Sequence, residues 1–202
     1  ANAGSATLVF DMVTLSDNVA MSGGGISNGG RTYLQNSTVS GNRAEGNDSL
    51  GGGIHNFQVL ELFQSTVAEN SASKGGGIHN EKIAYLFNAL VANNEGGDCY
   101  LLEKPHSFGS NLDSDSSCRL VGKFGDISGV EPRLGPLADY GGTTKTHRLM
   151  PGSPAIDAGK TYLSFSSDQR GLLRPQGQGW DIGAVEFEGF SIAPILFPLL
   201  LD

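Results

Sequence analysis

The chain has 202 residues and a formal net charge of −8, and 30 of its residues are glycine. This glycine content, about twice the average, disfavours a helical bundle because glycine destabilises helices, and an apolar fraction of 38% is too high for a disordered chain. Thirteen Lys and Arg residues against 21 Asp and Glu residues disfavour nucleic acid and anionic membranes as partners.

A repeat with a period of roughly 24 residues occupies the segment 1–98. One marker, Gly-Gly-Gly-Ile, stands at 23–26, 51–54 and 75–78, and its first interval is four positions longer than its second. A second marker is a four-residue phrase that begins with Leu or Val and ends with asparagine, at 15–18, 39–42, 67–70 and 91–94. Its final asparagines are Asn18, Asn42, Asn70 and Asn94, and the middle of the three intervals between them is longer by the same four positions. Both markers keep the same phase, so we expect the four extra residues to form a loop within 44–50.

Alignment of the repeats places apolar residues in columns that alternate with polar ones. The clearest columns are Phe10, Leu34, Leu62 and Leu86; Leu15, Val39, Val67 and Val91; and Ile26, Ile54 and Ile78. This alternation is typical of short strands with one buried face. It predicts an all-β fold, a parallel β-helix (a solenoid) in which each repeat is one coil. We expect about eight coils, stacked at about 4.8 Å.

Two asparagine columns mark corners of the predicted coils. One is the phrase-ending set above, and the other follows the glycine triplets: Asn28, Asn56 and Asn80. Stacked amide side chains can hydrogen-bond to one another along such a column, and asparagine tolerates the left-handed backbone of a sharp corner. We therefore expect both columns to form structural ladders.

A third polar column contains two histidines. His55 and His79 occupy equivalent positions in successive repeats, and Ser27 precedes them in the column. Two imidazoles one coil apart could hold a metal ion, but the column offers no third ligand and an asparagine follows each histidine. We therefore expect a solvated corner, with no metal site and no cofactor.

The outward positions of the repeats disfavour an enzyme. A glycosidase needs two carboxyl groups about 5–10 Å apart. Here the outward positions carry mostly Ser, Thr, Gln and Tyr, and Glu61 aligns with Tyr33 and Tyr85 rather than with another acid. Asp113 and Asp115 lie among serines, a context typical of a turn. We expect no catalytic residues.

Two sequons, at Asn36 and Asn47, match the N-glycosylation pattern. Asn36 aligns with Met12, Gln64 and Asn88, a column that could face inward. Asn47 lies in the inserted loop, so we expect it to be the more accessible of the two glycosylation candidates.

Residues 99–187 are predicted to form irregular coils and a cap. Cys99 and Cys118 lie nearly one coil apart along the chain and show no spacing typical of zinc ligands. We expect a disulfide between them, which would place the chain in an oxidising compartment. A pair of free buried thiols is the alternative.

The stretch 129–187 is rich in proline and glycine and predicts a last coil followed by a cap over the open end of the solenoid. Its charged residues are expected to pair with one another, and a cation site among the carboxylates is the alternative. These residues are Asp157, Asp168, Arg170, Arg174, Asp181 and Glu186.

The same stretch carries a series of motifs in a fixed order. They are Gly-Val-Glu-Pro-Arg-Leu-Gly-Pro-Leu at 129–137, Tyr-Gly-Gly-Thr-Thr at 140–144, Leu-Met-Pro-Gly-Ser-Pro-Ala-Ile-Asp-Ala-Gly at 149–159, Asp-Gln-Arg-Gly at 168–171, Arg-Pro at 174–175 and Asp-Ile-Gly-Ala-Val-Glu at 181–186. In order and spacing this series resembles the C-terminal signature of the choice-of-anchor Q family. The upstream repeats are also similar to those of polymorphic outer membrane proteins.

The resemblance covers most of residues 23–187. It implies a secreted or surface-displayed prokaryotic protein with a right-handed parallel β-helix, and it supplies no catalytic residues. Family members usually continue into a recognisable anchoring signal, and this chain departs from that pattern at its end.

Residues 188–202 form an apolar tail in the sequence. It is broken by Pro194 and Pro198 and is shorter than the roughly 18 residues of a membrane helix, so we expect no membrane span. We expect the tail to pack on its own solenoid or to serve as an assembly interface with a second copy. Its apolar residues are Phe190, Ile192, Ile195, Leu196, Phe197, Leu199, Leu200 and Leu201.

Together these features predict an extracellular or cell-surface structural β-helix protein without enzymatic activity. We expect copies to self-associate head-to-tail into a filament, with adhesion as a further role and surface glycans as further partners. The alternative is a carbohydrate-binding or polysaccharide-cleaving β-helix, which an aromatic-lined face with two close carboxylates would favour.

Overall fold

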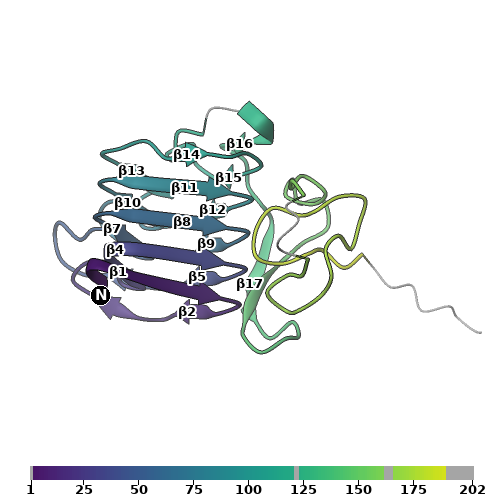
Figure 1. The fold of residues 1–202 in the computed structure, drawn as a ribbon, viewed down its shortest axis with the longest axis horizontal. Helices are drawn as coiled ribbons and strands as arrows, with labels where there is room; N and C mark the ends of the chain where they lie inside the picture. The colour runs from purple at the N-terminus through teal and green to yellow at the C-terminus, as the bar shows by residue number, and fades with distance from the viewer. Residues whose placement is uncertain (1, 121–122, 162–165, 190–202) are drawn as a thin grey trace, which may run out of the picture.

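The computed structural model describes residues 2–120, 123–161 and 166–189, and these form a parallel β-solenoid (Figure 1). The one helical element among the described residues is a short 3-10 turn, Lys123–Gly125. The predicted all-β, parallel solenoid class is therefore confirmed.

The longest sheet has eight strands and forms one wall of the solenoid. At its base β1 (Asn2–Asp11) pairs with the long β4 (Ile26–Gln35). Above β4 each coil contributes two shorter strands to this wall. They are β7 (Ile54–Asn56) and β8 (Val59–Phe63), β10 (Ile78–Asn80) and β11 (Ile83–Phe87), and β13 (Cys99–Leu101) and β14 (His106–Ser107).

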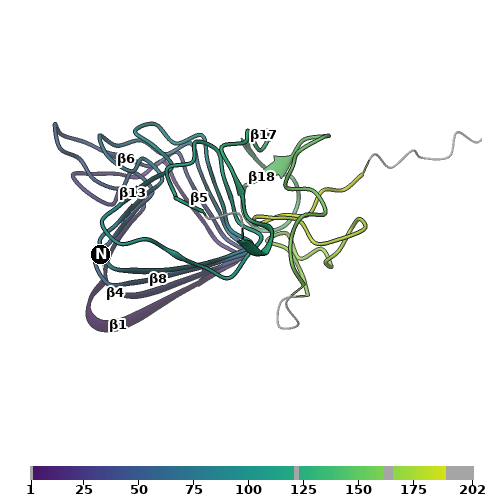
Figure 2. The ribbon, with the colours of Figure 1, turned by 90° about the horizontal axis from the view of Figure 1, so that it is seen from above.

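A six-stranded sheet forms the second wall, and a small two-stranded sheet lies on the third side of the coil. The six strands are β2 (Thr14–Ser16), β5 (Thr38–Ser40), β9 (Thr66–Ala68), β12 (Leu90–Ala92), β15 (Leu112–Asp113) and β16 (Ile127–Ser128). The small sheet pairs β3 (Val19–Ala20) with β6 (Arg43–Ala44). Viewed down the stack, the coils superimpose in a three-sided outline (Figure 2). The stack is shorter than the eight coils we expected, because residues after 128 leave it.

The predicted apolar columns stack in register inside the solenoid. Leu34 pairs with Leu62, which pairs with Leu86, and the other two columns align in the same way. Every member from the second repeat onward is at most 5% exposed. Since burial of one such side chain contributes roughly 1.5–3 kcal/mol, these columns are the main source of cohesion between coils.

Each coil turns its corners with residues in the left-handed backbone region. The corner between the first two walls uses Met12, Asn36, Gln64 and Asn88, with φ between 43° and 53°. At the corner of the glycine triplets, Gly51 has a φ of 62°, and its neighbour Gly52 lies so close to the adjacent chain that a Cβ would meet the Ser71 carbonyl oxygen at 2.3 Å. The triplets are therefore required by backbone packing between coils.

Both asparagine columns form hydrogen-bonded ladders. The Nδ2 groups of Asn42 and Asn70 each donate to the Oδ1 of the next asparagine, at 2.9 and 3.0 Å, and to backbone carbonyls of their own coil and the coil below. In the second column, Asn28 donates to Asn56 at 2.7 Å and Asn56 donates to Asn80 at 2.6 Å. These buried amides tie the corners of neighbouring coils together.

Residues 129–161 and 166–189 form a side lobe, which lies along the stack instead of closing one end (Figures 1 and 2). It contains one hairpin, β17 (Leu134–Ala138) with β18 (Thr146–Leu149). Its hydrogen bonds reach successive coils at Thr38, Thr66 and Asn88, and Ile182 packs with Leu90 in a second apolar core. The position differs from the one that we expected, over an open end, because the second wall carries outward Leu90 and Leu112, on which the lobe packs its own apolar side chains, beside polar partners such as Thr38 and Thr66.

Substitution of Asn70 by Ala is expected to lower the free energy of unfolding by about 2–4 kcal/mol, because it removes one rung and leaves buried backbone groups without partners. The matched control is Asn47→Ala in the exposed inserted loop, for which we expect a change within about 0.5 kcal/mol. Urea unfolding followed by circular dichroism measures both, and equal stability of the two variants would contradict the ladder's role.

Candidate functional site

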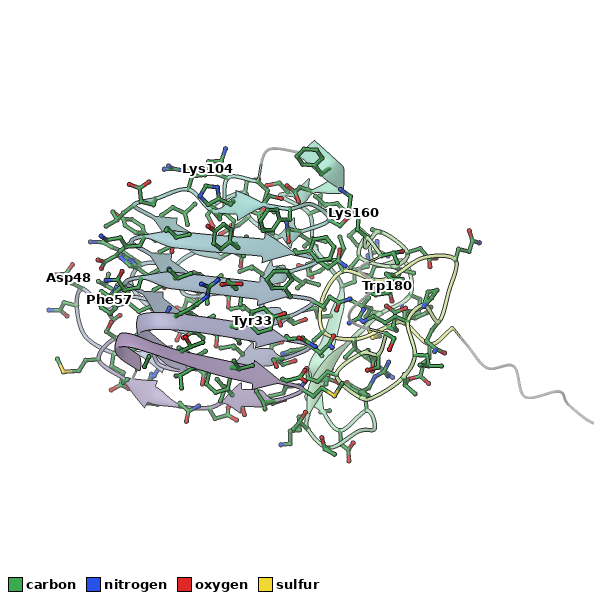
Figure 3. All side chains as sticks on the ribbon, viewed as in Figure 1. Tyr33, Asp48, Phe57, Lys104, Lys160 and Trp180 are labelled. Carbon is green, nitrogen blue, oxygen red and sulfur yellow. A yellow bond between two sulfur atoms is a disulfide. The ribbon has the colours of Figure 1, made fainter. Side chains whose placement is uncertain are left out.

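The outward side of the long wall carries two columns of large side chains. Strand register places Tyr33, Glu61, Tyr85 and His106 in one column and Gln35, Phe63 and Phe87 in the next. Phe108 follows β14 and stacks on Tyr85, with ring centroids 5.6 Å apart and planes at 7°. We call this surface the aromatic face, defined by Tyr33, Phe63, Tyr85, Phe87, His106 and Phe108. In Figure 3, Tyr33 lies on the wall that is turned toward the viewer.

The rings of the aromatic face contact one another along the stack. The Phe63 centroid lies 5.2 Å from that of Tyr33 and 6.1 Å from that of Phe87, and His106 stacks on Tyr85 at 5.2 Å. Exposure varies along the stack: Phe87 is 6% exposed, whereas Phe108 is 53% exposed. The parallel register thus brings rings from successive repeats together in one strip.

Polar groups lie between these rings. The Tyr33 hydroxyl donates to Gln35 Oε1 at 3.2 Å, and Glu61 forms an ion pair with Arg31 across adjacent strands. In its column Glu61 is flanked by Tyr33 and Tyr85, as the sequence indicated. The face therefore combines flat apolar surfaces with hydrogen-bonding groups, and Glu61 is already paired with a cation.

Near the opposite edge of the wall, the structure brings two histidines and one glutamate together. His55 Nε2 lies 2.8 Å from Glu81 Oε1, and His79 Nε2 lies 3.7 Å from the same oxygen. The potential ligand atoms of the three residues all lie within 4.8 Å of one another. We call this group the histidine cluster. Sequence reasoning missed Glu81 because it lies outside the histidine column, in the turn after β10, although the His-Asn-Glu spacing at 79–81 places it close to His79.

The surroundings of the histidine cluster hold both imidazoles in place. Phe57, labelled at the edge of the wall in Figure 3, stacks on His55 at 3.8 Å, and Tyr100 stacks on His79 at 5.1 Å. Both histidines are at most 3% exposed, so the solvated corner that we expected is wrong: the neighbouring rings cover it. Burial, followed by the neighbouring His55, lowers the pKa of His79 to about 4, and this imidazole is therefore neutral at neutral pH.

The Cys99–Cys118 disulfide is present, with Cα atoms 4.8 Å apart, which confirms that prediction. It covers the upper end of the main core, where the asparagine ladder has ended. Asp113 accepts a hydrogen bond from the Cys118 amide at 3.0 Å, and Asp115 accepts from the amides of Asp98 and Ser117. These aspartates thus organise the turns around the disulfide.

Two arginines of the side lobe form ion pairs within the lobe, and Asp157 and Asp181 accept hydrogen bonds from its backbone amides. Arg174 and Glu186 form a fully buried ion pair at 2.7 Å, and Arg170 pairs with Asp168 at 2.7 Å. Glu186 also accepts from the Asp181 amide at 2.9 Å. Burial raises the pKa of Asp181 to about 7, against the hydrogen bonds that it accepts. These carboxylates are occupied by donors from the lobe itself, which favours pairing over the alternative of a cation site.

The two sequons differ in accessibility. Asn36 is 1% exposed at a coil corner, and its Oδ1 accepts from Arg174 at 3.4 Å. The structure therefore contradicts Asn36 as a glycosylation candidate, because the side lobe covers it. Asn47 is exposed in the inserted loop. The predicted assembly residues, from Phe190 to Leu201, lie outside the described residues.

Comparison of the chain with protein-family models, curated proteins and solved structures found no match. Among the described residues, the structure contains no helix with the length and apolarity needed to cross a membrane.

Substitution of Glu186 by Gln is expected to lower the free energy of unfolding by about 3–5 kcal/mol, because it leaves the Arg174 guanidinium buried without its counter-ion. Glu188→Gln is the matched control, since this carboxylate pairs with Arg170 at the surface and is 55% exposed; its loss should cost at most about 1 kcal/mol. Thermal and urea unfolding measure the difference, and two equally stable variants would show that the buried pair does not stabilise the lobe.

Proposed function

We propose that this chain is an extracellular, non-catalytic structural β-solenoid whose aromatic face binds glycans. The observation that carries the proposal is the strip of rings along the long wall, where Tyr33 contacts Phe63 and Tyr85 contacts His106 and Phe108. Phe87 is 6% exposed and supports Phe63 from below the surface. The disulfide supports an oxidising compartment, and therefore an extracellular location.

The chemistry of the aromatic face suits a sugar chain. The C–H faces of a pyranose ring are apolar and pack on flat aromatic rings, whereas its hydroxyl groups need hydrogen-bonding partners. The face supplies both, since Gln35 and Glu61 lie beside the rings of Tyr33 and Phe63. An elongated strip that follows the stack fits an extended polysaccharide better than a compact ligand.

Binding without cleavage is favoured by the state of Glu61. A glycosidase pairs two carboxyl groups at short range, but the neighbours of Glu61 in its column are tyrosines, and Arg31 already neutralises its charge. Glu61 is therefore assigned to hydrogen bonding with hydroxyl groups and not to acid–base chemistry.

The rigidity of the solenoid supports the structural part of the proposal. Buried ladders, in-register apolar columns and the disulfide fix the spacing between rings on successive coils. A preorganised strip loses little conformational entropy when a ligand binds, so weak contacts repeated along a polymer add up to useful affinity.

Removal of exposed rings should weaken glycan binding. We expect Phe108→Ala combined with Tyr33→Ala to weaken the affinity measured by electrophoresis on gels with embedded polysaccharides by about thirtyfold, since two lost stacking surfaces are together worth roughly 2 kcal/mol. Leu173→Ala is the control, because Leu173 is 68% exposed on the side lobe. Absence of retention on a broad polysaccharide panel, or equal retention of the double variant, would refute the glycan proposal.

Self-association is the second candidate, and one observation favours it. The lowest coil exposes apolar side chains, with Val9 at 65%, Val19 at 59% and Met21 at 84% exposure. Strand register puts Val9 in the outward column of Tyr33 and Val19 in that of Arg43, so these side chains line the sides of the lowest coil and are suited to contact with a second copy.

Sedimentation velocity tests this second candidate. We expect the chain to form species larger than a monomer as its concentration rises, and Val19→Ser combined with Met21→Ser to shift the distribution toward monomer. A wild-type chain that stays monomeric at high concentration would exclude self-association while leaving the glycan proposal intact.

A further inference from the structure

We propose that the histidine cluster, formed by His55, His79 and Glu81, binds a zinc ion. The site is independent of the aromatic face and of glycan binding, because it lies near the other edge of the wall. Two imidazoles with one carboxylate are a donor set that zinc accepts, with a fourth position left to water.

The spacing of the three residues suits a tetrahedral ion. Zinc–nitrogen and zinc–oxygen bonds of about 2.0–2.2 Å place neighbouring tetrahedral ligands about 3.3–3.5 Å apart. Glu81 Oε1 lies 2.8 Å from His55 Nε2 and 3.7 Å from His79 Nε2, on either side of that value. The widest separation between ligand atoms is at most 4.8 Å, so side-chain rotations must bring the two imidazoles closer together for all three residues to coordinate.

The hydrogen bonding of His55 prepares its Nε2 for a cation. Its Nδ1 hydrogen-bonds with the Ser22 hydroxyl, which also lies 3.4 Å from the Leu50 carbonyl oxygen. When the hydroxyl donates to this carbonyl, it accepts from Nδ1–H, and the lone pair of His55 Nε2 then faces the Glu81 carboxylate. A cation between the two makes this arrangement favourable, and an outer partner on Nδ1 is typical of metal-binding histidines.

His79 supplies the second, independent observation. Its side chain is 4% exposed, its Nδ1 is buried without a hydrogen-bond partner in the part of the chain that the structure describes, and its Nε2 is too far from Glu81 for a hydrogen bond. A buried imidazole without polar partners costs free energy. Coordination of a metal at Nε2 gives this ring its first polar interaction among the described residues, while Nδ1 keeps none there.

The charges around the cluster permit a cation. Glu81 is 31% exposed, so an ion can enter from solvent on its side. Lys74 opposes a bound cation, but its ammonium is paired with Asp48 at 3.7 Å and lies over the Tyr100 ring at 5.9 Å. Stacking of Phe57 and Tyr100 on the two imidazoles holds the ligands in position before the ion arrives.

Zinc titration of the chelator-dialysed full chain tests the proposal. We expect about one equivalent of zinc to bind by isothermal titration calorimetry, zinc to raise Tm because it binds the folded state, and cobalt in its place to give the visible absorption of a tetrahedral site. Glu81→Gln should weaken zinc binding at least about tenfold. This variant keeps a similar shape at a partly exposed position, and the metal-free Tm checks that it folds.

Two further variants separate this site from other zinc ligands. His79→Gln should abolish the cobalt spectrum, whereas His106→Gln, which removes an exposed histidine on the same wall, should leave stoichiometry and affinity unchanged. Absence of zinc binding by the wild type would overturn the proposal. So would binding that survives Glu81→Gln and His79→Gln unchanged, or that disappears with His106→Gln.

Discussion

The vertical register between successive coils is the constraint on which the rest of the structure depends. Parallel pairing places each residue over its equivalent in the next repeat, so that Leu34, Leu62 and Leu86 share one column. The same register joins the amides of Asn42, Asn70 and Asn94 into a ladder. A shift by one residue would move every apolar side chain outward and every ladder amide out of reach, so the hydrophobic and polar columns enforce one another.

Both candidate sites are products of this register. A single tyrosine or phenylalanine per repeat has little meaning in the sequence, yet the register brings Tyr33 against Phe63, and Tyr85 against Phe108, on one wall. In the same way, His55 and His79 become neighbours although a full coil of sequence separates them. The repeats thus support binding as well as stability. Outward positions do not pack in the core, so side chains of one type can recur there and line up along the stack.

The sequence predicts the coils of the solenoid, but it does not predict where the side lobe lies. Apolar columns and asparagine phrases repeat with a fixed phase, so the solenoid, its ladders and the position of the loop at 44–50 follow from spacing alone. The side lobe does not repeat, and it meets the coils through polar side chains such as Thr38 and Thr66 and through the apolar Leu90. Because the lobe has no counterpart in the other repeats, their spacing does not predict its position. Glu81 was missed for a related reason, since it reaches His55 through a turn and not through the column.

The placement of the side lobe also changes how the rod can come apart. In an array where each repeat touches only its neighbours, end repeats can unravel while the middle persists. Here Gln169 contacts the coils of Thr14 and Thr38, and Gly183 and Ala184 contact those of Asn88 and Thr66, so one compact body grips several coils at once. Peeling away any single coil breaks these contacts too, which couples the coils into one cooperative unit. Because the lobe bridges several coils, we expect the stack to unfold in one cooperative transition, as a globular domain does.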